Sequence, residues 1–134
     1  MAMIKVPVNP QTSLKRRIKQ FYDLLDRGDF SRCHRMLDPR LRRNPHAVTL
    51  LQYENSLREF VGRAGPIRVV DIDVVAHLNK PSVLYEGRDF AVGETRWLDE
   101  SGTQREFKER WVRDGRVWYT RCTGLLFPSP TAAA

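Results

Sequence analysis

The hydrophobic residues of this chain change their spacing once, at Gly65 and Pro66, and this change limits the folds that the chain can adopt. Before it, apolar residues recur every three or four positions, as along one face of a helix; after it, they alternate with polar residues, as along a strand. Helices followed by strands predict an α+β domain, and 134 residues are enough for one such domain but too few for two. We therefore expect three N-terminal helices packed on one face of an antiparallel sheet.

Capping residues place the three helices. Thr12 or Ser13 can cap the first helix, and Gly28 ends it as a residue with left-handed backbone. A shorter helix follows over 29–38 and stops at a proline, because the residue before a proline avoids the helical conformation. Asn44 stands directly before another proline, a pair typical of a helix start, so the third helix runs from there to the change in spacing.

Four or five strands are predicted in the second half of the chain. The first is long and β-branched, and a turn over 79–81 follows it. Asp114 and Gly115 then form the two-residue turn of a hairpin. The predicted strands cover 67–78, 83–86, 90–98, 104–112 and 116–123.

The loops predict how these strands pair. A five-residue loop over 99–103 sets Glu94 opposite Lys108, a favourable pair of opposite charges. A two-residue loop at Asp114 and Gly115 sets Glu109 opposite Thr120. All three tryptophans then fall on one face of the sheet, and we expect the helices to cover that face.

Glu109 is the one acid on the tryptophan face of the central strands. A carboxylate among apolar side chains must be paired, hydrogen-bonded or protonated, and a glutamate near neutrality is suited to act as a general acid or base. The small residues Ala91 and Gly93 leave room beside it for a ligand. We predict an apolar pocket with Glu109 as candidate catalytic acid or base, lined by Trp97, Trp111, Trp118, Tyr53, Thr120 and Phe107.

The structural alternative is that Glu109 closes the core and binds nothing. In that case its carboxylate bonds Arg105, Tyr53 or a backbone amide. Both readings stay open at the level of sequence.

The positive charge of the chain is concentrated near its N-terminus. Residues 1–46 hold eleven of the 23 Lys and Arg but four of the 16 Asp and Glu, and this segment carries the whole net charge of +7. Such asymmetry can mark a surface for nucleic acid or an anionic membrane. Few aromatic residues interleave with these cations, so a solvated basic face is the simpler interpretation and nucleic acid an unfavoured partner.

Other function classes leave no trace in the sequence. No His or Cys stands at metal-ligand spacing from another, and no phosphate loop or dinucleotide motif is present, so neither a metal nor a cofactor is expected. The N-terminus has no apolar signal core, and no apolar run reaches the ~20 residues of a membrane span. We expect a cytoplasmic protein without a membrane span.

Two segments resemble a known family. Leu24 to Phe30 (LLDRGDF), followed by a short helix ending in Leu37-Asp38-Pro39 and then a longer one, is similar to the opening of NTF2-like (SnoaL/ketosteroid-isomerase-like) domains. Residues 107–118 (FKERWVRDGRVW) are similar to the last hairpin of that superfamily. The resemblance covers 12–124, and its motifs concern the fold rather than catalysis. We expect an N-terminal extension over 1–11, a single NTF2-like domain over 12–127 and a flexible tail over 128–134.

The resemblance implies a cone-shaped fold in which a curved sheet wraps around the helices, with a pocket between them. It also implies a homodimer through the outer sheet face. The functions of the family range widely, and the fold alone does not choose among them. We expect a domain that binds a small apolar molecule, with proton-transfer chemistry of the isomerase, dehydratase or cyclase type through Glu109. The alternatives are a non-catalytic dimeric protein-interaction module and binding of nucleic acid or an anionic surface through 1–46.

Overall fold

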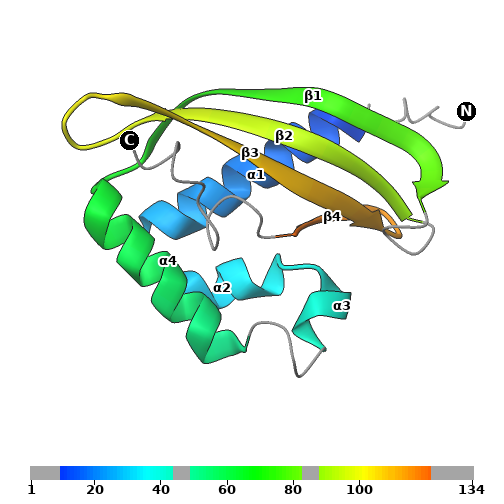
Figure 1. The fold of residues 1–134 in the computed structure, drawn as a ribbon, viewed down its shortest axis with the longest axis horizontal. Helices are drawn as coiled ribbons and strands as arrows, with labels where there is room; N and C mark the ends of the chain where they lie inside the picture. The colour runs from blue at the N-terminus through cyan, green and yellow to red at the C-terminus, as the bar shows by residue number, and fades with distance from the viewer. Residues whose placement is uncertain (1–9, 44–48, 83–87, 122–134) are drawn as a thin grey trace, which may run out of the picture.

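The computed structural model describes residues 10–43, 49–82 and 88–121. These residues form helices and then strands, as the change in hydrophobic spacing predicts, and the sheet is antiparallel with strand order β1-β2-β3-β4 (Figure 1). The helices are α1 (Pro10–Asp26), α2 (Phe30–Arg35), α3 (Pro39–Arg42) and α4 (Leu50–Ala64). The strands are β1 (Arg68–Ser82), β2 (Arg88–Leu98), β3 (Gln104–Asp114) and β4 (Val117–Thr120). The α+β class is confirmed.

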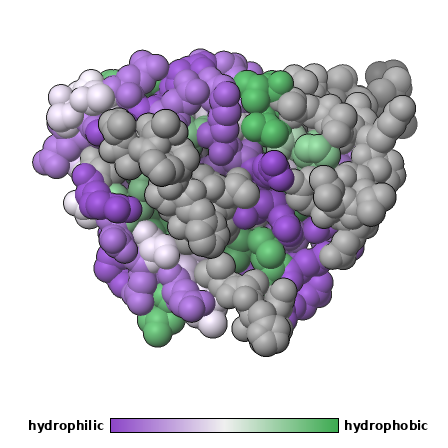
Figure 2. Space-filling view, viewed as in Figure 1, coloured by the Kyte–Doolittle hydropathy of each residue, from purple (hydrophilic) through white to green (hydrophobic). Residues whose placement is uncertain are grey.

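All the described helices lie on one side of the sheet (Figure 1). α1 runs directly beneath the strands, and α2 and α4 lie farther from the sheet, on the other side of α1. The apolar residues that recur every three or four positions along α1 are buried: Leu14, Ile18, Phe21, Tyr22 and Leu25 are at most 1% exposed. Seen from the direction of Figure 1, the described surface is mostly hydrophilic, and hydrophobic side chains form small separate patches (Figure 2).

Some of the helix ends lie where the capping residues predict them, and others do not. Gly28 adopts φ 74° after α1, and the Asp29 side chain accepts a hydrogen bond from the backbone N–H of Arg32 at the start of α2, both as predicted. The predicted start of the third helix at Asn44 is wrong for α4, which begins at Leu50 with Thr49 as N-cap. Thr49 forms a reciprocal capping box with Gln52, which satisfies two backbone donors at once. Asn44 itself lies outside the described residues.

The helix α3 was not predicted. It begins at Pro39, where the sequence places only the end of α2, because Asp38 accepts a hydrogen bond from the backbone N–H of Arg40 and so caps a new turn. The Asp38 carboxylate is also fully buried, and Arg88 binds both of its oxygens, at 2.6 and 2.9 Å. Arg121 binds it as well, at 2.6 Å. One carboxylate therefore joins the α2–α3 turn to the start of β2 and the end of β4.

The strand β1 is longer and less regular than the sequence predicts. The turn expected over 79–81 is wrong, because β1 continues to Ser82. Pro81 is tolerated there since β1 is an edge strand in the described sheet, and an edge strand need not use every N–H. The register shifts at Val70 and at Val75 also break the predicted strict alternation along β1. The strand predicted over 83–86 lies outside the described residues.

The two hairpins test the predicted registers. Glu94 pairs with Lys108 between β2 and β3, as predicted. The pairing of β3 with β4 is displaced by two residues, so Thr120 lies opposite Trp111 rather than opposite Glu109. The turn starts at Gly115, with φ 65°, because the favoured hairpin turns need a positive φ at their first central residue and glycine adopts it without strain. The displacement by two residues leaves the side chains on their predicted faces.

The predicted covered face of the sheet is confirmed by burial. Its residues on β2, β3 and β4 are at most 7% exposed: Ala91, Thr95, Trp97, Phe107, Glu109, Trp111, Trp118 and Thr120. The opposite face is partly or fully exposed at most positions, and Val112 is its buried exception. The core therefore lies between this face and the helices.

Candidate functional site

The candidate site is centred on Glu109 in the middle of β3. Its side chain is 2% exposed and projects toward α1, where the hydroxyl of Tyr22 donates a hydrogen bond of 2.7 Å to Oε1. The second oxygen, Oε2, is buried and has no hydrogen-bond partner among the described residues. One carboxylate oxygen of Glu109 thus accepts a hydrogen bond, and the other has no hydrogen-bond partner among the described residues.

Burial controls the protonation of this pair. It raises the pKa of Glu109 from 4.5 to about 7, although the hydrogen bond from Tyr22 and the nearby indole N–H of Trp111 favour the charged form. Burial and the adjacent carboxylate also raise the pKa of Tyr22 well above its ordinary value, so the phenol keeps its proton. At neutral pH Glu109 therefore exists in both its charged and neutral forms, whereas Tyr22 is only a donor to it.

Three further buried polar groups lie on the same face of the sheet. Thr95, on β2, is 1% exposed, and its side chain lowers the pKa of the Tyr22 phenol against the larger effect of burial. The indole N–H groups of Trp97 and Trp111 are buried without a hydrogen bond of good geometry to any described residue. Buried donors without partners are rare in proteins because each costs free energy. This face thus offers one carboxylate oxygen and two N–H donors to any polar group placed against it.

The space expected beside Gly93 of β2 is filled. A Cβ built on Gly93, which pairs with Glu109, would lie 2.6 Å from the Cδ1 of Ile18 on α1. Gly93 therefore allows α1 to approach the sheet closely. The prediction that Gly93 leaves room for a ligand is wrong at this position.

The other predicted lining residues divide into separate groups. Trp97 and Phe107 stack with their ring centroids 5.8 Å apart, and Phe60 of α4 packs edge-on against both. Trp111 contacts Phe21 of α1 edge-on, with centroids 6.1 Å apart. The aromatic wall of the candidate site thus has one part beside α4 and another beside α1.

The remaining three predicted residues lie at other contacts. Tyr53, near the start of α4, is 1% exposed and meets the ring of His34 edge-on at 5.5 Å. Trp118 packs under the guanidinium of Arg113, which lies 5.6 Å from the centroid of its ring. Thr120 exchanges backbone hydrogen bonds of 2.9 Å with the chain that leaves α2, donating to Met36 and accepting from Asp38.

Tyr22 is the residue of the candidate site that the sequence did not single out. It counts there as one of several apolar positions of the first helix, and the expected partners of Glu109 were Arg105, Tyr53 or a backbone amide. Arg105 instead binds Asp99, at 3.0 Å. The available signal was the hydroxyl itself, since a tyrosine on a buried stripe needs a hydrogen-bond partner and Glu109 was the acid on the face opposite.

Two grooves lined by described residues flank α1, and neither includes Glu109. One, of about 560 Å³, lies between α1 and β1; the other, of about 340 Å³, lies between α1 and β4. The described residues contain no group of three or more side chains suited to hold a metal ion. No helix within the described ranges has both the length and the apolar composition needed to cross a membrane.

No protein-family model matches this chain. No curated protein matches it either. The resemblance to NTF2-like domains thus stays a prediction, and the function must be argued from the site itself.

Proposed function

We propose that this protein binds a small hydrophobic molecule between its helices and its sheet, and that Glu109 exchanges a proton with that molecule. The observation that carries the proposal is a carboxyl group 2% exposed to water whose pKa burial raises to about 7. A group that is half charged near neutral pH can both take and return a proton with little driving force lost. Structural carboxylates that only stabilise a fold are usually fully charged and paired, as Asp38 is here.

The proposed chemistry is proton transfer at a carbon atom next to a carbonyl group. Tyr22 holds Oε1, which leaves Oε2 to accept the proton from that carbon. The electron pair of the broken C–H bond moves onto the carbonyl oxygen, where an N–H donor such as that of Trp111 stabilises the negative charge. Glu109 then returns the proton to another atom of the same molecule, so the overall reaction needs no cofactor.

The aromatic groups around the carboxyl suit an apolar ligand. Trp97, Phe107 and Phe60 form a continuous cluster between the sheet and α4, and each of the three is at most 7% exposed. Ile18 occupies the space on the α1 side. The ligand therefore enters from the α4 side, and entry requires Phe60 to move away from the sheet.

The finer description of the fold belongs to the same proposal. We infer that the sheet and helices form the cone-shaped NTF2-like arrangement, with 12–127 as its single domain. The order of helices before strands and their position on one face support this inference. A pocket between the two layers is where such an arrangement would hold its ligand.

Binding and chemistry are tested separately. A panel of apolar ketones is titrated against the intrinsic tryptophan fluorescence, and the ketones that bind are then incubated with the protein in D2O. We expect NMR to detect exchange of the hydrogens next to the carbonyl with the wild-type chain. Glu109→Gln should retain the quenching, because the amide keeps the size and shape of the side chain, but should lose the exchange.

The control is Glu106→Gln, an exposed glutamate on the same strand. It should change neither the quenching nor the exchange. The proposal fails if no ketone changes the fluorescence, or if exchange continues at the same rate in Glu109→Gln.

A further inference from the structure

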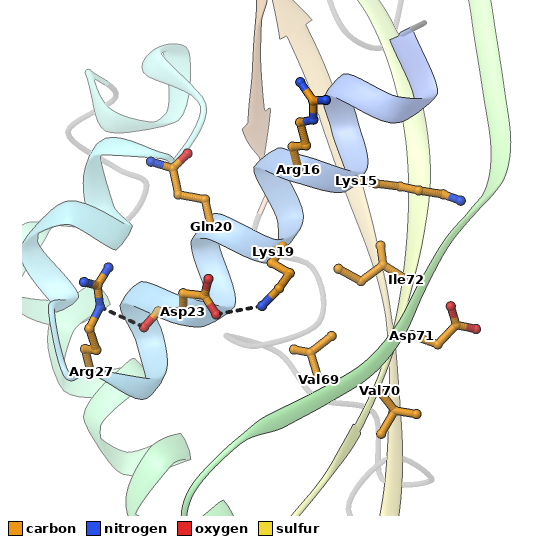
Figure 3. A pocket seen from close by; sticks show the side chains of 10 residues that line it. All are labelled: Lys15, Arg16, Lys19, Gln20, Asp23, Arg27, Val69, Val70, Asp71 and Ile72. Carbon is orange, nitrogen blue, oxygen red and sulfur yellow. Dashed lines mark hydrogen bonds and ion pairs between the residues drawn. The ribbon is translucent and has the colours of Figure 1, made fainter.

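The groove between α1 and β1 has two chemically different walls (Figure 3). The helix wall carries four cations, Lys15, Arg16, Lys19 and Arg27. The strand wall carries the aliphatic side chains of Val69, Val70 and Ile72. Lys15 reaches from the helix toward the strand, and Val69 and Ile72 point back toward the helix (Figure 3). We call this surface the α1–β1 groove.

Most of the positive charge of the groove is not neutralised by ion pairs with the described residues. Of its two acids, Asp23 accepts a hydrogen bond of 3.1 Å from Lys19, and Asp71 forms an ion pair with Arg96 of β2. No described carboxylate forms an ion pair with Lys15, Arg16 or Arg27. The groove therefore presents positive charge to a partner.

The aliphatic wall has an exposed apolar side chain at its rim. Val70 is the extra residue at a register shift of β1, and 57% of its surface is exposed. A β-bulge re-aims a side chain, and here the bulged residue lines the groove at its edge, with its side chain directed away from α1 (Figure 3). A partner that covers this exposed valine removes apolar surface from water, and that burial favours binding.

We propose that the α1–β1 groove docks an extended acidic segment of a partner protein, whose carboxylates contact α1 and whose aliphatic side chains contact β1. Lys15 and Arg27 are twelve residues apart, about 18 Å along the helix, a length that about five or six extended residues cover. A nucleic acid fits this surface less well. None of the described lining residues is aromatic, so bases have nothing to stack on, and the strand wall adds aliphatic side chains and the acid Asp71 rather than cations.

The test is an NMR titration of the isotope-labelled chain with a synthetic peptide of about six residues that alternates glutamate and leucine. We expect shift changes confined to α1 and the first half of β1, and binding that weakens as salt is added. Arg16→Glu should raise the dissociation constant at least about fivefold, because it replaces an attraction by a repulsion. Arg63→Glu, on an exposed helical arginine outside the groove, should leave the dissociation constant within about twofold.

Two matched comparisons test the contribution of each wall of the groove to peptide binding. Val70→Ser should weaken binding of the peptide, whereas Val75→Ser, at the other exposed bulge of β1, should not. Replacing glutamate by glutamine, or leucine by glycine, in the peptide should abolish binding. The proposal is overturned if Arg16→Glu binds as tightly as the wild type, or if the glutamine peptide binds equally well. It is also overturned if a short single-stranded DNA, or vesicles of anionic lipid, occupy the groove and the acidic peptide does not.

Discussion

At the scale of single residues, the pair Tyr22 and Glu109 carries the proposed function. A buried carboxyl group beside Trp111 and a phenol is neutralised more easily than one in water, because burial penalises the charged form. The same burial gives the protein a dependence of stability on pH that can be measured without knowing any ligand.

The sign of this dependence follows from the raised pKa of Glu109. Between pH 4.5 and about 7 the native state keeps a proton that the unfolded state has lost, so the free energy of unfolding falls as the pH rises through this range. The fall due to Glu109 is about 3 kcal/mol. In Glu109→Gln this contribution is absent, and urea unfolding at a series of pH values measures the difference between the two chains.

Glu106→Gln is the reference for this experiment, because Glu106 lies exposed on the same strand. It should follow the wild-type curve. Parallel curves for the wild type and Glu109→Gln would contradict a raised pKa at Glu109.

The sequence predicted half of this site. It identified Glu109, because an acid between Phe107 and Trp111 on a buried face is conspicuous in an alternating strand. It could not identify Tyr22, since no local pattern tells which residue of a helix lies over which residue of a sheet. That depends on how closely α1 approaches β2, and Gly93 sets this approach through a contact between residues far apart in the chain.

At the scale of elements, the contact of α1 with the sheet depends on Gly93. We predict that Gly93→Ala destabilises the fold by about 1–3 kcal/mol, because the new Cβ overlaps the Cδ1 of Ile18. Ile18→Val removes that methyl group and should cost about 0.5–1.5 kcal/mol by itself. The double variant should lose less free energy of unfolding than the two single variants together, as measured by urea unfolding, because the shorter side chain makes room for the new Cβ. Strict additivity would show that Ile18 does not fill the space above Gly93.

The second element contact is the carboxylate shared by the α2–α3 turn and two strands. Asp38→Ala should lower the free energy of unfolding by about 3–5 kcal/mol, because Arg88 and Arg121 lose the carboxylate that they share. Asp23→Ala is the matched change at an exposed ion pair and should cost less than about 1 kcal/mol. Equal losses in the two variants would mean that Asp38 does not hold these elements together.

The strand registers show which pairings the sequence could predict and which it could not. Opposite charges fixed the β2–β3 pairing correctly, because Glu94 and Lys108 leave one favourable register. The β3–β4 pairing was displaced because Asp114 and Gly115 suggest a turn whose first residue is Asp114, whereas the positive φ falls on Gly115. No glycine marks the bulges at Val70 and Val75, so the alternation of apolar and polar residues did not predict their positions.

At the scale of the whole molecule, the change in hydrophobic spacing was enough to predict the α+β class, and the three tryptophans on one face of the sheet predicted the face that the helices cover. The association of copies stays a prediction. We predict a homodimer through the outer face of the sheet, which mixes half-buried Val92 and Leu98 with charged residues. Val92→Arg should then reduce the mass in sedimentation to that of a single chain. Leu51→Arg, on the exposed side of α4, should not, and a monomeric wild type would refute the prediction.

The central claim is that the carboxyl of Glu109 is poised near neutrality, and the most direct measurement is its titration by carbon-13 NMR of labelled glutamate side chains. We predict a midpoint near pH 7 in the wild type. In Tyr22→Phe the midpoint should move higher, because the phenol donates its hydrogen bond to the charged form. A midpoint near the ordinary value of 4.5, unchanged in Tyr22→Phe, would contradict the account and remove the basis for proton transfer.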